Sequence, residues 1–150
     1  IIKQLGEIMQ FNLTTDYAIR IIYCLSKQKT IVTSHEISEK MGIPQHYVLK
    51  IMRNLTAAGL AERFSGIQGG FRIARKKINL YDVTRAVEPK MAIARCMEPD
   101  CYCSLGMQET CQLRKFYMQM QKTMDGMLSG KLITDLIQES EQAEPGENPA

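Results

Sequence analysis

The sequence lacks the features of several large functional classes. No run of apolar residues approaches the ~18 that a membrane-spanning helix needs, so we expect no membrane partner. It contains no C-x-x-C pair of the kind used by dithiol redox enzymes and no glycine-rich phosphate loop. It also contains no acid–base pair beside a candidate nucleophile. We therefore expect a protein that is not an enzyme.

The 150 residues, of which 45% are hydrophobic and 23% are charged, fit one modest folded unit. Residues 1–8 lack the basic-then-apolar build of a secretion signal, so we expect a cytoplasmic protein whose five cysteines stay as thiols or ligands. The same residues contain no methionine. We expect that Met9 starts the natural chain and that residues 1–8 are an upstream leader.

Positive charge is concentrated in the front part of the chain. Residues 1–90 carry 14 Lys and Arg against 7 Asp and Glu, a net charge of +7, and residues 91–137 carry 5 of each sign. A basic front part indicates a polyanionic partner, although a solvated surface gives the same count. Residues 138–150 carry four Glu and little apolar surface, which predicts a disordered acidic tail.

Residues 33–58 predict two helices joined by a short turn. Thr33 and Glu36 have the spacing of a capping box at the start of the first helix, and Gly42 suits the left-handed backbone at its end. Pro44 suits the first turn of a second helix, whose apolar positions recur at helical spacing. This is the pattern of a helix-turn-helix.

Residues 60–75 predict a β-hairpin, because two short extended runs flank the glycine-rich turn SGIQGG. A helix-turn-helix followed by a hairpin with basic flanks is typical of a winged helix. We therefore predict a mainly α fold with a small β-hairpin, in which residues 9–90 form a winged helix-turn-helix DNA-binding domain. A winged helix that binds only protein is the alternative.

DNA binding needs cations for the phosphates and exposed hydrogen-bonding side chains for the bases. The second helix of the motif carries such residues opposite its apolar stripe, although His46 also fits a merely solvated residue. Two glycines of the turn would let the wing approach a phosphate backbone or minor groove closely. The predicted DNA-binding residues are Gln45, His46, Lys50, Arg53, Asn54, Gly69, Gly70 and Arg72.

Four of the five cysteines lie in a predicted loop, residues 91–111. They are Cys96, Cys101, Cys103 and Cys111. The spacing C-x4-C-x-C-x7-C differs from the paired knuckles of structural zinc sites, and thiolates spread over a longer loop suit an iron–sulfur cluster. A zinc site, a disulfide or free thiols are the alternatives. Cys24 lies on the apolar face of the first predicted helix, where we expect it to pack.

Beyond the cysteines, apolar residues recur every three or four positions and predict a helix of about five turns that ends at Ser129-Gly130. Residues 134–137 are predicted to add one more turn. The stripe is rich in methionine, a side chain that packs adaptably, and is suited to a core or to a seam between subunits. Its members are Leu113, Phe116, Tyr117, Met120, Met124 and Met127.

The chain resembles the winged-helix regulators typified by the iron–sulfur repressor IscR and the nitric-oxide-sensing repressor NsrR. The resemblance covers residues 9–137 and rests on TTDYAIR, HEISEKMGIPQHYVLKIMRNLTAAGL, SGIQGGFRIAR, YDVTRAVE, TCQLR and KLITDLI. It implies a bacterial transcription regulator, most simply a repressor, that senses nitric oxide, redox state or the supply of iron and clusters. It also implies a homodimer, paired through the helix region 112–137, on a palindromic DNA operator.

The resemblance further implies an iron–sulfur cluster, 4Fe–4S or 2Fe–2S, held by three loop cysteines. Cys96 and Cys111 match the outer two ligands. Cys103 is the closer match for the middle ligand, although the spacing departs slightly from the family's. Cys101 is the alternative, either in its place or as a fourth thiolate. Where IscR-like proteins have a histidine ligand, this chain has Arg114.

The motif C-S-L before T-C-Q-L-R resembles the NsrR-like branch more closely. In that branch a carboxylate of the partner subunit completes the cluster, and Asp16 in TTDYAIR matches it. A charge that favours the helix dipole is the alternative for Asp16. Some relatives lack the cysteines, so the alternative function is a cluster-free winged-helix regulator controlled by a protein partner or by a zinc-stabilised loop.

Overall fold

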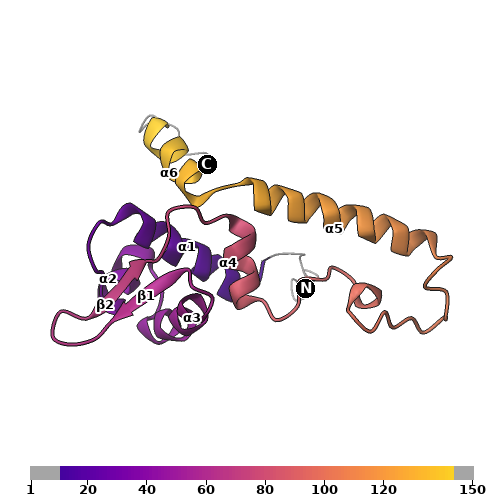
Figure 1. Ribbon diagram of the computed structural model, residues 1–150, viewed down its shortest axis with the longest axis horizontal. Helices are drawn as coiled ribbons and strands as arrows, with labels where there is room; N and C mark the ends of the chain where they lie inside the picture. The colour runs from indigo at the N-terminus through magenta and orange to yellow at the C-terminus, as the bar shows by residue number, and fades with distance from the viewer. Residues whose placement is uncertain (1–10, 144–150) are drawn as a thin grey trace, which may run out of the picture.

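The computed structural model describes residues 11–143, in which a compact head carries one long projecting helix (Figure 1). The predicted leader (residues 1–8) and the predicted start at Met9 lie outside the described residues, as do residues 144–150 of the predicted tail. The elements are α1 (Leu13–Lys27), α2 (Ser34–Met41), α3 (Gln45–Ala57), β1 (Ala61–Phe64), β2 (Gly70–Ile73), α4 (Leu80–Val87), the short 3-10 helix η1 (Arg95–Met97), α5 (Gln112–Gly130) and α6 (Ile133–Gln142). The predicted fold, mainly α with a β-hairpin in a winged helix-turn-helix, is confirmed.

Helix α1 is the centre of the head. It packs against α2, α3, α4, α6 and β2. The Asn12 side chain caps its start by accepting a hydrogen bond from the Thr14 amide (3.0 Å). Its buried residues are Thr15, Ala18, Ile21, Ile22, Cys24 and Leu25. Cys24 is buried as expected, and this burial raises the pKa of its thiol.

Helices α2 and α3 form the predicted helix-turn-helix. The Thr33 amide donates to Glu36 Oε2 (2.7 Å), and the Glu36 amide donates to Thr33 Oγ1 (3.2 Å), which completes the capping box. Gly42 ends α2 with a φ of 63°, in the left-handed region. Pro44 stands just before α3, as its N-cap, rather than inside the first turn. The apolar face of α3 is buried through Val48, Ile51, Met52 and Leu55.

The wing is anchored to the head by backbone contacts. Val32 and Phe71 exchange two hydrogen bonds of 2.8 Å each. A Cβ atom on Gly70 would lie 2.5 Å from the Val32 carbonyl oxygen, and one on Gly69 would lie 2.7 Å from the Phe64 carbonyl oxygen. Both glycines are therefore required by close approaches within the protein, a reason that the sequence alone does not reveal.

The cysteine loop leads the chain away from the head, α5 runs back so that its end lies at the head, and α6 follows there (Figure 1). The Leu80 amide donates to the Lys131 carbonyl (3.0 Å), and the Ile133 amide donates to the Ile78 carbonyl (2.9 Å). These two bonds fix the end of α5 beside the start of α4. None of the helices within residues 11–143 is long and apolar enough to cross a membrane.

The C-terminal segment differs from the prediction of a single turn at 134–137 followed by a disordered tail from 138. Helix α6 continues to Gln142. Ile133 is buried in the core of the head and Ile137 packs against that core, so the helix has an apolar face to bury. Lys131 pairs with Glu139 on the exposed side. The segment from 138 to 142 is therefore an extension of a packed helix.

We predict that Gly70→Ala destabilises the head, because the new methyl group meets the Val32 carbonyl, which is held by the wing. Overpacking of this kind costs about 1–3 kcal/mol in the free energy of unfolding. Urea denaturation of the full chain measures it. Gln68→Ala, at an exposed position of the same turn, is the control and should change stability little. Equal stability of the two variants would contradict the close approach.

Candidate nucleic-acid interface and cysteine loop

The exposed face of α3 carries the cations predicted to contact DNA. Lys50, Arg53 and Asn54 are all exposed. Within residues 11–143, neither Lys50 nor Arg53 takes part in an ion pair. Their charge is therefore available to phosphates.

The start of α3 is held by local contacts. Gln45 is exposed, and its Nε2 donates to the Ser34 hydroxyl (3.0 Å), which ties α3 to the start of α2. The exposed His46 ring lies beside the Tyr47 ring, with centroids 4.5 Å apart. Of the residues predicted to contact DNA, Gln45 and His46 thus have neighbours within the protein that orient them at the start of α3.

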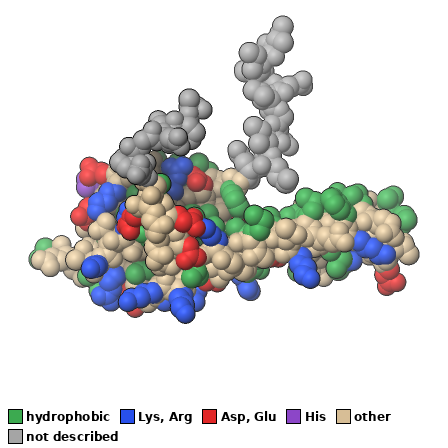
Figure 2. All heavy atoms as spheres, turned by 90° about the horizontal axis from the view of Figure 1, so that it is seen from above, with side chains coloured by type: hydrophobic (Ala, Val, Ile, Leu, Met, Phe, Trp, Pro, Cys, Tyr) green, Lys and Arg blue, Asp and Glu red, His purple; other side chains and the backbone are tan. Residues whose placement is uncertain are grey.

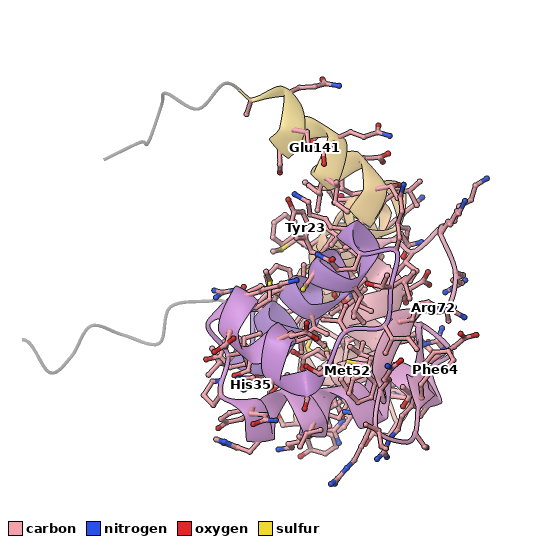
Figure 3. All side chains as sticks on the ribbon, turned by 90° about the vertical axis from the view of Figure 1, so that its left-hand side faces the viewer. Tyr23, His35, Met52, Phe64, Arg72 and Glu141 are labelled. Atoms are coloured by element: carbon pink, nitrogen blue, oxygen red, sulfur yellow. The ribbon has the colours of Figure 1, made fainter. Side chains whose placement is uncertain are left out.

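Arg72 lies on the outer face of the wing, close to Phe64 (Figure 3). It forms an ion pair with Glu62 (3.0 Å), and its guanidinium carbon lies 4.9 Å from the centroid of the Phe64 ring. Glu62 and Arg72 face each other across the two strands. The neighbouring carboxylate offsets the charge that Arg72 can present to a phosphate.

Arg63 is a further basic residue of this interface that is not among the predicted contacts. It pairs with Phe71 in the hairpin register, so it lies on the face of the wing that is turned toward α3. It lines two adjoining hollows of about 300 and 190 Å³, the smaller of which Arg53 also lines. Strand alternation, counted from the apolar Phe71, is the signal that could have identified Arg63.

The cysteine loop meets α5 around Arg114. The Arg114 Nε donates to the Cys96 carbonyl (3.3 Å), and its Nη2 lies 3.8 Å from Cys101 Sγ. The Arg114 amide donates to Sγ of Cys111, the N-cap residue of α5 (3.4 Å). Cys101 is exposed and has a φ of 49°, whereas Cys96, Cys103 and Cys111 are half-buried. One arginine thus touches three of the four loop cysteines.

Cys103 has a different environment. The backbone N–H groups of Met107, Leu105 and Gly106 lower the pKa of its thiol, because they stabilise a negative charge on the sulfur. Such a site favours the thiolate, which is the form that binds metals.

A short ion pair closes the loop around η1. Arg95 pairs with Asp100, and this hydrogen-bonded guanidinium lowers the pKa of Asp100 to about 2. The Arg95 guanidinium also lies over the Tyr102 ring, 5.3 Å from its centroid. The segment between Cys96 and Cys101 is thereby folded back on itself.

The donor chemistry of the loop fits an iron–sulfur cluster, because several soft thiols lie in one segment and the anion of Cys103 is stabilised. However, within residues 11–143 no three Cys, His, Asp or Glu side chains converge as metal ligands. Asp16 lies in the first turn of α1, where it pairs with Arg20 (2.6 Å). Within one chain, Asp16 is therefore part of the head and not of the cysteine loop.

The apolar stripe of α5 is largely exposed. Phe116 is 55% exposed and Met127 is 72% exposed, while Leu128 is the residue of α5 that is buried. Figure 2 shows hydrophobic side chains in a row along one edge of α5, and Lys and Arg side chains along its other edge and over the head. An open hollow of about 620 Å³ follows this stripe, lined by Phe11, Phe116, Met120, Met124, Met127 and Leu128, among others. The described part of the chain does not cover this face.

A helix-turn-helix with free cations on its second helix, followed by a basic hairpin, defines a winged-helix DNA-binding protein. Residues 11–139 match the family model Rrf2, described as an iron-dependent transcriptional regulator. The chain is 30% identical over 135 residues to the protein aau3 of Rhizobium meliloti, a match that spans 86% of this chain and 85% of aau3. The chain therefore belongs to the Rrf2 family of transcriptional regulators.

Solved structures share the fold. The IscR of T. potens aligns with a TM-score of 0.74 and 18% identity over 93% of this chain and 94% of that one. CymR of B. subtilis, described as the global cysteine regulator, aligns with a TM-score of 0.72 and 18% identity over 88% of this chain and 98% of its own. At this identity the likeness shows the fold alone.

We predict that Lys50→Ala weakens DNA binding across sequences, because it removes a free cation from the phosphate-facing surface. The slope of log K against log salt should become shallower by about 1. Fluorescence anisotropy on a duplex selected by the wild-type chain from a random pool measures this slope. Lys122→Ala, at an exposed position on α5, is the control and should leave the slope unchanged. A slope that is insensitive to both Lys50→Ala and Arg53→Ala would show that α3 is not the DNA-facing helix.

Proposed function

We propose that this protein is a homodimeric bacterial repressor whose affinity for a palindromic operator is controlled by an iron–sulfur cluster. The observation that carries the proposal is the group of four cysteines at the start of α5, a helix whose apolar face is exposed. The cluster supplies a redox-active centre that reacts with nitric oxide or oxygen and depends on the supply of iron. This function requires a place in the cytoplasm, beside the DNA.

In this proposal Cys96, Cys103 and Cys111 hold the cluster. Cys103 is supported by the backbone N–H groups that lower the pKa of its thiol. Cys101 is the alternative middle ligand, but its sulfur is exposed and lies beside the Arg114 guanidinium. The motif around Cys103 also supports a place near the nitric-oxide-sensing branch of the family.

The fourth ligand in this proposal is Asp16 of the partner subunit. The Asp16 side chain is 43% exposed, so a second chain can reach its carboxylate. Its pairing with Arg20 fixes its direction and is the interaction that a metal would compete with. A ligand from the opposite subunit would join the loop of one chain to the head of the other.

The dimer is proposed to form through α5, with a second copy of this helix as the occupant of its apolar face. Fully burying a Phe or Met side chain contributes about 1.5–3 kcal/mol relative to leaving it exposed. Several such side chains along one exposed stripe supply the apolar core of a subunit interface. Two α3 helices related by a two-fold axis then suit the two halves of a palindrome.

The second candidate is a cluster-free regulator controlled by a protein partner or by a zinc-stabilised loop. The observation that favours it is the lack of convergence among the possible ligands within residues 11–143. The fold likeness to a cysteine regulator is compatible with it. Anaerobic purification from iron-supplied cells, with visible absorption and iron and sulfide analysis, separates the two candidates. Colourless protein without sulfide that still binds DNA supports the second.

We predict that Cys96→Ser and Cys111→Ser each abolish the visible absorption of the anaerobically purified protein while the dimer stays folded. Loss of one thiolate removes a ligand that serine does not replace for iron. Cys101→Ser should retain the absorption and Cys103→Ser should lose it. Matched circular dichroism and size-exclusion chromatography check the fold. A full cluster in both the Cys96 and Cys111 variants would refute the ligand assignment.

We predict that Asp16→Ala gives a cluster that is lost faster in air or with nitric oxide, because one iron loses its protein carboxylate. The decay of visible absorption measures the rate. Glu139→Ala, which removes an exposed carboxylate from α6, is the control and should decay as the wild type does. If Asp16→Ala leaves both the spectrum and the decay unchanged, Asp16 is only a helix-start charge.

A further inference from the structure

The start of the cysteine loop runs alongside α5 and is held there by two side chains of that helix. Gln121 and Arg114 are seven residues apart, about two helical turns, and therefore lie on the same side of α5. Gln121 binds the backbone of Met91 and Ile93, and Arg114 binds the backbone of Cys96. We call these two side chains the loop clamp.

Gln121 recognises the backbone as another peptide group would. Its Oε1 accepts from the Ile93 amide (2.9 Å), and its Nε2 donates to the Met91 carbonyl (3.1 Å). The same Nε2 donates to Asp125 Oδ1 (2.9 Å), one turn further along α5, which sets the orientation of the amide. All three residues that it touches are half-buried, so the bonds are shielded in part from water.

Arg114 fixes the other end of this segment. Its side-chain Nε donates to the Cys96 carbonyl, and its backbone amide donates to Cys111 Sγ. Both outer loop cysteines therefore contact Arg114. The Nη1 atom lies 3.8 Å from Met118 Sδ, so the side chain is supported along α5. The guanidinium offers several donors in a fixed plane, a geometry that a lysine ammonium lacks.

We propose that the loop clamp, Gln121 and Arg114, positions Cys96 against Cys111 and so sets the affinity of the loop for a metal centre. The inference rests on the proposed function, because it assumes that these cysteines are ligands. Contacts outside the ligand set that orient metal ligands typically change metal affinity by 10–100-fold. The bonds of Gln121 and of the Arg114 Nε go to backbone atoms of the loop, so they act on ligand position, while the Arg114 Nη2 also lies 3.8 Å from Cys101 Sγ.

The test is an anaerobic titration of the reduced full-length chain with Co²⁺, which gives thiolate-to-cobalt absorption bands. We expect Gln121→Ala and Arg114→Gln to weaken Co²⁺ binding at least about tenfold while the band positions of the final complex are kept. Gln121→Glu cannot donate to Met91 and sets a carboxylate beside Asp125, so it should weaken binding at least as much as Gln121→Ala. Arg114→Lys keeps the charge but not the planar donors, so it should be weakened as Arg114→Gln is.

Gln119→Ala is the control, at an exposed position on the same helix. Hydrogen exchange of the Ile93 amide is a second readout that needs no metal, and Gln121→Ala should speed it at unchanged melting temperature. Wild-type Co²⁺ affinity in both Gln121→Ala and Arg114→Gln, or full rescue by Arg114→Lys, would overturn the proposal. Cys96→Ser distinguishes failure of the proposed function from failure of the loop clamp. If Cys96→Ser binds Co²⁺ as the wild type does, the proposed function fails. If Cys96→Ser loses binding while Gln121→Ala and Arg114→Gln keep it, only the loop clamp fails.

Discussion

Burial of one face of α1 is the interaction on which the head depends. Ile21 and Ile22 have no exposed surface, and each contributes about 1.5–3 kcal/mol by leaving water. The same helix packs against both helices of the helix-turn-helix, the wing, α4 and α6. The position of α3 relative to the wing is therefore set by the contacts of both with α1 and by the direct packing of α3 on β1. The contact between α1 and the end of α5 is indirect. Helices α4 and α6, which flank the end of α5, both pack on α1.

The cysteine loop, unlike the head, is not held by buried apolar side chains. None of residues 91–111 is buried, and the loop is held by hydrogen bonds and ion pairs in place of an apolar core. A typical intramolecular hydrogen bond contributes only about 0.5–1.5 kcal/mol net. A segment with few buried contacts opens at low cost compared with the head. The molecule thus combines a head with an apolar core and a cysteine loop that has none of its residues buried.

The elements that the sequence predicts are those determined by neighbours in the chain. The Thr33–Glu36 capping box and the left-handed Gly42 depend on residues within one or two turns, and both occur as expected. The wing is also found where its glycine-rich turn predicts it. The fold could therefore be derived almost entirely from local patterns and helical spacing.

The features that the sequence does not reveal depend on contacts between distant residues. Gly70 is required because of Val32, and α6 continues because Ile133 finds the core of the head. Arg63 joins the interface through its strand register. In the candidate site, the cysteines and the exposed cations of α3 are evident from the sequence. The central place of Arg114 is not, since three-dimensional proximity to Cys96 and Cys101 defines it.

One side-chain hydrogen bond joins the start of α1 to the residue after α4. The hydroxyl of Thr15, a fully buried residue, donates to the carboxylate of Glu88, which directly follows α4 where the chain leaves the head for the loop. Regulation requires only a difference in free energy between two arrangements, and about 1.4 kcal/mol changes DNA affinity tenfold. That is close to the net contribution of one hydrogen bond. In the proposed function, one polar contact that differs between two arrangements of the loop would therefore be enough to change DNA affinity, and the Thr15–Glu88 bond joins the chain at the start of the loop to α1.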